Sequence, residues 1–197
     1  TGDDMFDMSE GFNGRLQFLI GFNSTQITPR TGAGSFASDL EGIENDGCNG
    51  SGCDNGFNTA PFTTPLVANF TLIGCGDVAC VGSAGGYGMM LRRGTGGYYV
   101  NGVVARFPRA GVSMRDAETF GRAGSTATPD ISAADLAIRN VLFADVAGNV
   151  FQAGGGSTIQ NAFDLGGNAL TSSTAAAASL LTALPAQGSA PSGASAF

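Results

Sequence analysis

The chain has 197 residues, a formal net charge of -7 at pH 7 and a sequence pI near 4.3. Its nine basic residues are all arginine, and histidine, lysine and tryptophan are absent. Without histidine, the chain cannot use Ser-His-Asp or Cys-His nucleophile activation, or histidine-ligated zinc. Without lysine, it cannot form a Schiff base or supply the lysine of a P-loop. Few arginines under a negative net charge also argue against a nucleic-acid partner.

The content of glycine and of apolar residues indicates a folded, turn-rich domain. Glycine accounts for 32 residues, more than twice the roughly 7% of an average protein. Apolar residues make up 43%, which is enough for a core in a single domain of this length. The longest apolar runs, such as residues 136–146, are interrupted by charge and fall short of the ~20 residues that span a bilayer. We therefore expect no transmembrane segment.

Short β-rich runs recur along the first 152 residues and are separated by glycine, asparagine and aspartate. Each run mixes alternating polarity with β-branched or aromatic residues, which is typical of strands. The runs are 15–22, 66–73, 89–93, 98–107, 111–115, 136–143 and 149–152. No segment before residue 170 shows a clean helical stripe of apolar residues, so the sequence predicts a mainly β domain over residues 1–152.

Two spacings within these runs predict a parallel β-solenoid. Asn69, Asn101 and Asn140 each precede an apolar stretch, and Arg92 and Arg115 lie 23 residues apart, close to one coil of a three-sided β-helix. In such a solenoid, asparagines at the corners can form a ladder between coils, and glycines allow tight bends. Loops such as residues 32–58 would then protrude from some coils. A β-sandwich is the alternative, because it also has many short strands with turns between them.

The four cysteines form two pairs of equal spacing, and each pair encloses four residues. The pairs are Cys48 with Cys53 and Cys75 with Cys80. Small loops of this kind can bring two Cα atoms within the about 4.4–6.8 Å that a disulfide needs. A four-cysteine metal site is the alternative, although zinc knuckles usually enclose two residues. We favour a disulfide within each pair, and hence a secreted protein from an oxidising compartment.

The composition changes at residue 153, which begins a C-terminal segment over residues 153–197. A glycine run opens this segment, and the following residues are rich in alanine and serine. Residues 173–184 predict one short helix that ends before Pro185. The segment is expected to be either a disordered tail or a cap. A cap would cover the open solenoid end or dock on a partner, because an uncapped end exposes a strand edge and apolar core.

The opening segment, Gly-Asp-Asp-Met-Phe-Asp-Met over residues 2–8 and its continuation to residue 18, resembles an acidic and aromatic segment of a family of large exported bacterial proteins. Three later stretches match the same family in the same order: residues 40–46, 64–74 and 91–108. The resemblance covers residues 1–118. It implies a right-handed parallel β-helix on the outer surface of a bacterial cell or secreted from it, and it carries no catalytic role. The chain lacks the long N-terminal half of that family and adds the two cysteine pairs.

Two acidic clusters are candidate calcium sites, because calcium prefers several carboxylate and carbonyl oxygens. The first contains Asp3, Asp4, Asp7 and Glu10, and the second contains Glu44, Asn45, Asp46 and Asp54. Neither has the spacing of an EF-hand or of a calcium-binding nonapeptide repeat. Solvated acidic turns are therefore the alternative, and we expect no cofactor unless calcium binds here.

Three arginines are candidate ligands for the carboxylates of uronic sugars, since a guanidinium can bind a carboxylate through two hydrogen bonds. They are Arg92, Arg93 and Arg115. If Arg92 and Arg115 matched on successive coils, they would repel each other unless acids such as Asp116 and Glu118 lay between them. A ladder of surface charge is the alternative, and a β-helix by itself does not indicate an enzyme.

The sequence therefore favours an exported, non-catalytic structural or surface protein. Its role would be self-assembly or adhesion, with open coil edges that add strands from another subunit. The chain begins at Thr1 inside a turn-like segment, which predicts a processed piece of a longer precursor. The expected partners are a homo-oligomer or the rest of that precursor. The alternative is a carbohydrate-binding or polysaccharide-cleaving module that takes a glycan.

Overall fold

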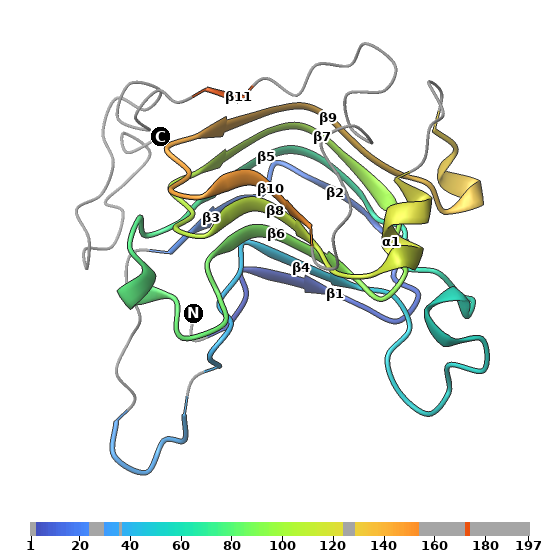
Figure 1. Cartoon of the computed structure of the whole chain (residues 1–197), viewed down its shortest axis with the longest axis horizontal. Coiled ribbons are helices and arrows are strands. Elements are labelled where there is room, and N and C mark those ends of the chain that lie inside the picture. The colour runs from blue at the N-terminus through green and yellow to red at the C-terminus, as the bar shows by residue number, and fades with distance from the viewer. Residues whose placement is uncertain (1–2, 24–29, 36, 124–128, 154–171, 174–197) are drawn as a thin grey trace.

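The computed structural model describes residues 3–23, 30–35, 37–123, 129–153 and 172–173. The strands form two parallel sheets that face each other (Figure 1). In spatial order, sheet A contains β1 (Phe6–Met8), β4 (Ile43–Asp46), β6 (Tyr87–Arg92), β8 (Ala110–Met114) and β10 (Asn149–Ala153). Sheet B contains β11 (Ser172–Ser173), β9 (Leu136–Ala144), β7 (Gly97–Ala105), β5 (Leu66–Ile73) and β2 (Arg15–Gln17), and β3 (Ile20–Phe22) also pairs with β5.

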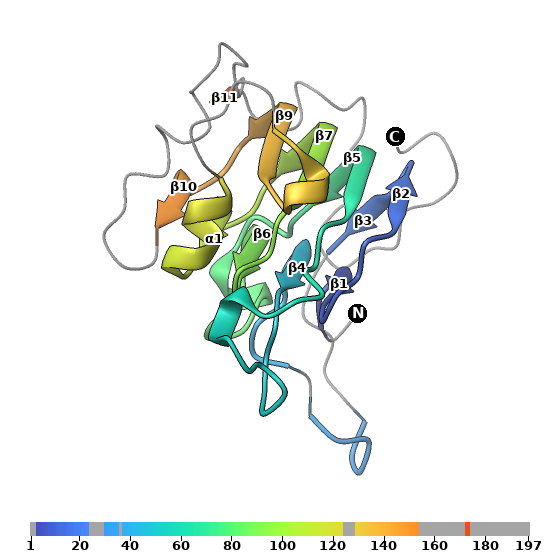
Figure 2. The same cartoon turned by 90° about the vertical axis from the view of Figure 1, so that its right-hand side faces the viewer.

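The chain passes back and forth between the two sheets. We call one strand of sheet A together with the sheet B strands that follow it a rung, so that β1, β2 and β3 form the N-terminal rung and β4 and β5 the next. Every neighbouring pair of strands is parallel, and Figure 2 shows the two stacks of strands side by side. The predicted mainly β fold is confirmed, and its parallel pairing differs from the antiparallel pairing of a β-sandwich.

The core lies between the sheets and is made of apolar rows in register. Ile43, Met89 and Val112 form one such row across sheet A, and all three are fully buried. Large side chains from sheet B, including Phe70 and Phe143, fill the same cluster. Burial of each such side chain contributes about 1.5–3 kcal/mol. Stacked apolar rows therefore hold successive rungs together.

The long strands of sheet B each contain a residue with positive φ at the same register position. These residues are Asn69, Asn101 and Asn140, with φ of 55°, 61° and 52°. Asparagine tolerates this left-handed conformation better than most residues do. The Asn101 amide donates a hydrogen bond to Asn69 Oδ1 over 3.0 Å. The predicted asparagine ladder is therefore confirmed between Asn69 and Asn101, and Asn140 shares their register and backbone conformation.

The N-terminal rung places a different residue at this corner. Phe18 has φ of 59° and separates β2 from β3, and its backbone N–H donates to the carbonyl of Ala68. The pairing of Gln17 with Ala68 and of Ile20 with Thr71 puts Phe18 beside Asn69. The run 15–22, predicted as one strand, is thus two strands, because the left-handed residue interrupts it.

Four further details differ from the sequence prediction or lie beyond it. Strand β4 lies inside residues 32–58, which were predicted as a loop, because its short polar stretch is buried between β1 and β6. Helix α1 (Ala117–Arg122) was not predicted, and Asp116 caps it by accepting from the Thr119 N–H over 2.8 Å. Three short 3-10 turns also occur: η1 (Gly56–Asn58), η2 (Val78–Cys80) and η3 (Ile131–Ala133). Of the helix predicted for 173–184, Ser173 lies in strand β11 instead, and residues 174–184 lie outside the described residues.

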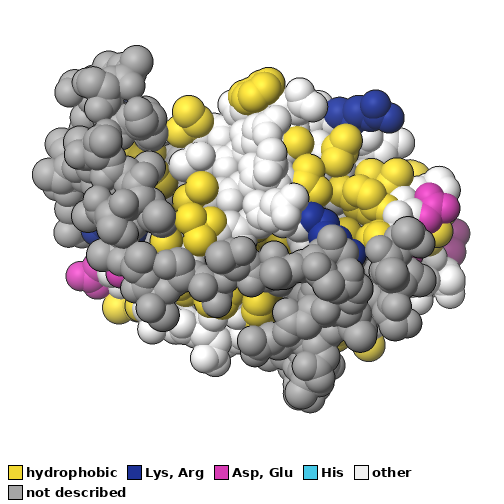
Figure 3. Space-filling view, turned by 90° about the horizontal axis from the view of Figure 1, so that it is seen from above, with side chains coloured by type: hydrophobic (Ala, Val, Ile, Leu, Met, Phe, Trp, Pro, Cys, Tyr) yellow, Lys and Arg dark blue, Asp and Glu magenta, His cyan; other side chains and the backbone are white. Residues whose placement is uncertain are grey.

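The surface seen from above carries few charged groups among its described atoms. Hydrophobic side chains gather there beside small basic and acidic patches (Figure 3). None of the helices in the described ranges is long and apolar enough to cross a membrane.

Candidate functional site

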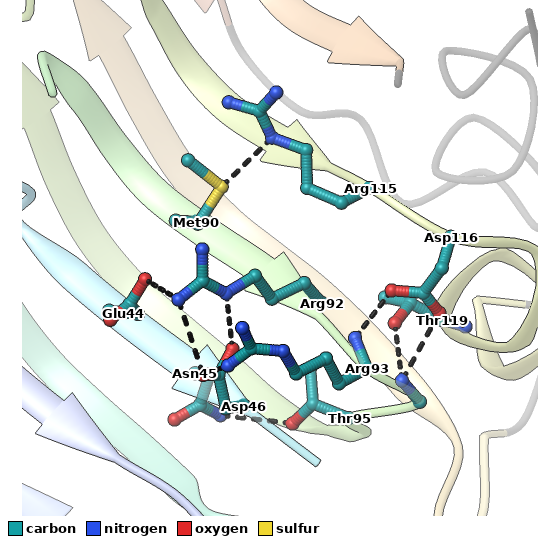
Figure 4. Close-up of polar contacts among 11 residues, drawn as sticks. Glu44, Asn45, Asp46, Met90, Arg92, Arg93, Thr95, Arg115, Asp116 and Thr119 are labelled. Atoms are coloured by element: carbon teal, nitrogen blue, oxygen red, sulfur yellow. Dashed lines mark hydrogen bonds and ion pairs between the residues drawn. The ribbon is translucent and has the colours of Figure 1, made fainter. Parts of the chain in front are cut away.

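The outer face of sheet A collects most of the residues that the sequence singled out. Asp7 pairs in register with Glu44, and Asp46 with Arg92, while the intervening Asn45 points into the core. Figure 4 shows Glu44, Asp46, Arg92, Arg93 and Arg115 together along β4, β6 and β8. We call Asp7 and these five residues the acid–arginine face.

Arg92 and Arg93 are neutralised by acids of the neighbouring strand. Arg92 lies 2.6 Å from Glu44 Oε1 and 2.6 Å from Asp46 Oδ1, and Arg93 also pairs with Asp46. Burial lowers the pKa of Arg92, but its hydrogen bond with Asp46 and the charges of both acids raise it overall. These two arginines are therefore paired with acids of the protein itself.

Asp116 and Glu118, the acids named as possible partners between the arginines, lie at helix α1. Asp116 accepts hydrogen bonds from the backbone N–H groups of Arg93 and Gly94 and caps α1. Asp116 thus sits at a helix N-terminus, where its carboxylate satisfies backbone donors. Glu118 lies in the first turn of α1, where its negative charge interacts favourably with the helix dipole. Neither makes an ion pair with an arginine among the described residues.

Arg115 differs from the other two predicted arginines, because it has no ion pair among the described residues. Its backbone N–H donates to the Leu91 carbonyl, which places it in register with Arg92 as predicted. Its guanidinium carbon lies 4.9 Å from the centre of the Tyr87 ring, and Nε lies 3.1 Å from Met90 Sδ. Within the described ranges it forms no ion pair, and the side chain is exposed.

Three carboxyl groups from the two acidic clusters come together beside the acid–arginine face. One oxygen of each of Asp4, Asp7 and Glu44 lies within 4.8 Å of the others. Burial, followed by the charge of Glu44, raises the pKa of Asp4 to about 8. Burial also raises the pKa of Asp7, with the charge of Asp46 as the next cause. Burial raises the pKa of Glu44 as well, although Arg92 opposes the shift.

Glu41 is a neighbour of this group that sequence reasoning missed. Its residue is 1% exposed, and Oε2 accepts the Tyr87 backbone N–H over 2.7 Å. The other oxygen, Oε1, has no hydrogen-bond partner among the described residues. Burial raises the pKa of Glu41 to about 9. The residue lies just before β4, where nothing in the local sequence indicates that a glutamate is buried.

The carboxyl groups of Asp4, Asp7 and Glu44 lie close enough together to hold a metal ion, and two of them already have partners within the protein. Calcium takes six to eight oxygen ligands, whereas Glu44 already pairs with Arg92 and Asp4 Oδ1 already accepts the Glu41 N–H over 2.6 Å. A second cation beside Arg92 would also meet its positive charge. Of the other predicted ligands, Asp46 is held by two arginines, Asp3 adds negative charge near Asp4, and Asp54 follows the first cysteine loop outside this group.

Both cysteine pairs lie at disulfide distance in the favoured connectivity. The Cα atoms are 5.8 Å apart for Cys48 and Cys53, and 6.4 Å apart for Cys75 and Cys80. The second pair is buried against Val81. The loop of the first pair lines a cavity of about 460 Å³ together with Glu10 and Pro61. The four-cysteine metal site is therefore excluded by this pairing.

Stacked parallel strands in two alternating sheets, with an asparagine corner, define this chain as a β-helix type of domain. The family model for a pectate-lyase-like beta helix domain matches residues 1–183. The chain therefore belongs to this family, and the resemblance inferred from its sequence to a β-helix family is confirmed. No curated protein and no solved structure matches the chain.

Proposed function

We propose that this chain is a non-catalytic β-helix module of an exported surface protein and that it acts in assembly or adhesion. Its rungs are proposed to be coils of a right-handed solenoid. Two local disulfides support an oxidising location outside the cell. The absence of histidine and lysine from the sequence supports a non-catalytic role, as does the internal pairing of Arg92 and Arg93.

The N-terminal rung carries this proposal. Within the described ranges, β1 pairs only with β4, and β2 and β3 pair only with β5. The outer edge of a parallel sheet offers free N–H and C=O groups to an added strand. Two large apolar side chains are exposed in this rung, Phe18 at 75% and Ile20 at 55%. An edge with exposed apolar side chains favours contact with another subunit or with the rest of a longer chain.

Sedimentation velocity over a wide concentration range tests this role. The wild-type chain is expected to associate as its concentration rises. The double variant F18S/I20S is expected to need about tenfold or more protein for the same association, since each lost apolar contact weakens binding by about 1–2 kcal/mol. The control is V78S, because Val78 is 54% exposed in η2 and lies outside this rung. A monomer at every concentration, or equal loss in the control, contradicts the proposal.

Recognition of an acidic glycan is a second candidate, and the exposed Arg115 favours it. Its guanidinium stacks on Tyr87 and has no carboxylate partner among the described residues. A charged guanidinium held by an aromatic ring can accept a sugar carboxylate. Calorimetry with polygalacturonate and with a neutral glucan tests this candidate. Heat from the acidic glycan alone, lost in R115A but kept in R30A, would support it, because Arg30 is exposed in a loop away from sheet A.

A further inference from the structure

We propose that Asn49 is a site of spontaneous modification, at which the side-chain amide is lost as ammonia and the residue becomes aspartate or isoaspartate. Four asparagines in the sequence are followed by glycine, the pair that favours this reaction: Asn13, Asn49, Asn55 and Asn101. The fold leaves Asn49 free to react and holds the other three in place. This modification goes beyond the role proposed above and occurs whether or not the N-terminal rung binds a partner.

The reaction needs a free backbone nitrogen in the residue that follows the asparagine. This nitrogen gives up its proton to water and attacks the side-chain amide carbon, so that a new C–N bond closes a succinimide ring. The C–N bond of the amide breaks, and its nitrogen takes up one proton and leaves as ammonia. Water then opens the ring at either carbonyl carbon, which gives aspartate or isoaspartate. Glycine favours the attack because it has no Cβ and its backbone turns freely.

The first cysteine loop exposes all the groups that this reaction uses. Asn49 and Gly50 are both exposed in the loop that Cys48 and Cys53 close. Among the described residues, neither the Gly50 N–H nor the Asn49 side chain has a hydrogen-bond partner. Gly50 has φ of 127°, and an added Cβ would meet no atom within 4 Å. The attacking nitrogen and the amide carbon are therefore both uncrowded and open to water.

Asn55 shows that exposure alone does not select the site. Asn55 and Gly56 are as exposed as the first pair, but the Gly56 N–H donates to the Cys53 carbonyl over 3.0 Å. The Asn55 side-chain amide donates to the carbonyl of Asn58 over 3.4 Å, and its backbone N–H donates to Thr59 Oγ1 over 2.8 Å. Attack at Asn55 therefore requires a local opening that breaks these bonds first.

Asn101 is held by the sheet itself. Its side-chain amide donates to Asn69 Oδ1 over 3.0 Å, and Gly102 is buried in β7 between β5 and β9. The backbone at this corner cannot turn toward the succinimide geometry without breaking the ladder between rungs. Its reaction should therefore follow the opening of sheet B, which is rarer than motion of a surface loop.

Asn13 is an intermediate case. It is exposed, and the Gly14 N–H has no hydrogen-bond partner among the described residues. The chain is fixed on both sides, because the carbonyls of Phe12 and Gly14 accept the N–H groups of Thr64 and Leu66 over 2.8 and 3.0 Å. The Phe12 ring also lies against Gly14, where an added Cβ would be 2.4 Å from it. We therefore expect Asn13 to react more slowly than Asn49 and faster than Asn101.

The product changes the charge of a cavity. Asn49 and Glu10 both line the cavity of about 460 Å³ beside the first cysteine loop. Conversion of the neutral amide adds a second carboxyl group to this lining. The isoaspartate form also adds a carbon to the backbone of the loop that the disulfide closes. The cavity thus becomes more negative, and its loop changes shape, as the protein ages.

Incubation of the full disulfide-bonded chain in mildly alkaline buffer tests the proposal, with peptide mapping by tandem mass spectrometry over time. Asn49 is expected to convert about tenfold or more faster than Asn55 and Asn101, because an opening that costs about 1.4 kcal/mol gives this factor. Asn13 is expected to lie between them. The reference is the same chain reduced and unfolded in urea, in which the four pairs should convert at similar rates.

Two matched variants give a second measurement by isoelectric focusing. N49Q should lose the first acidic species to form, because glutamine must close a larger ring, whereas N55Q should keep it. Loss in both variants, or in neither, overturns the proposal. In the wild-type chain, it is overturned if Asn13, Asn55 or Asn101 converts as fast as Asn49. It is also overturned if Asn49 does not convert while the unfolded chain does, and this comparison does not depend on the folding of a variant.

Discussion

The inner rungs and the N-terminal rung build the same corner and the same sheet face in different ways. An inner strand such as β6 has a neighbour on each side, its Arg92 is paired with acids of β4, and an asparagine occupies the corner of the adjoining sheet B strand. The N-terminal rung has described neighbours on one side, carboxyl groups without an arginine, and a phenylalanine at the corner.

This difference shows how a rung with described neighbours on one side differs from a rung that lies between two others. Within the stack, side chains such as Arg92, Asn101 and Phe70 meet partners one rung away, so that charge, hydrogen bonds and apolar surface are shared between rungs. In the N-terminal rung, the described residues provide such counterparts on one side. The N-terminal rung therefore exposes Phe18 and Ile20, and its outer strand edge has no partner among the described residues.

The largest expected loss of stability comes from a substitution in the core of the inner rungs. Phe70 is 1% exposed, and its ring packs against Gly102 of the next rung, where no side chain could fit. The variant F70A should lower the free energy of unfolding by about 3–5 kcal/mol, as for other buried aromatic residues. Chemical denaturation measures this change. The matched control is F12A, because Phe12 is 36% exposed in the N-terminal rung. Equal losses in the two variants would contradict a core centred on the inner rungs.

A smaller loss of stability is expected from a substitution on the acid–arginine face. D46N removes the charge that binds both Arg92 and Arg93 and leaves two partly buried guanidiniums without it. The expected loss is about 1–3 kcal/mol, because these groups are desolvated and hydrogen-bonded. The control is D145N, whose pair with Arg106 spans 3.9 Å and is half exposed, and which should cost under about 0.5 kcal/mol. Thermal and chemical unfolding that rank the two variants in reverse would contradict this account.

The elements predicted from the sequence are those set by local chemistry. Alternating apolar residues gave the strands, and Asn69, Asn101 and Asn140 stood out because asparagine suits a left-handed corner. The cysteine pairs followed from their short loops. In each case the determining residues lie close together in the chain or repeat at the spacing of a rung, so a pattern in the sequence carries the information.

The partners within the site were not predictable, because they come from different rungs. Arg92 and Asp46 are separated by 46 residues, and the register that joins them depends on where β4 begins. Glu41 gave no signal, since its burial results from β1 and β6 meeting on either side of it. Phe18 was hidden for another reason: an aromatic residue is unfavourable at positive φ, so a strand was the better local expectation.

The smallest expected change in stability comes from substitutions at the left-handed corner position of sheet B, where the inner rungs and the N-terminal rung differ. F18N places an asparagine in the left-handed position beside Asn69, where it relieves an unfavourable backbone conformation and can extend the ladder. We expect unfolding to cost about 1 kcal/mol more than in the wild type. The reverse change, N101A, should lose about 1 kcal/mol, because alanine is strained at φ of 61° and cannot bond to Asn69. Both changes are measured by chemical denaturation. If F18N destabilises the chain while N101A has the expected effect, then Phe18 makes contacts that the ladder cannot replace, and the N-terminal corner is specified by its aromatic side chain rather than by the asparagine repeat.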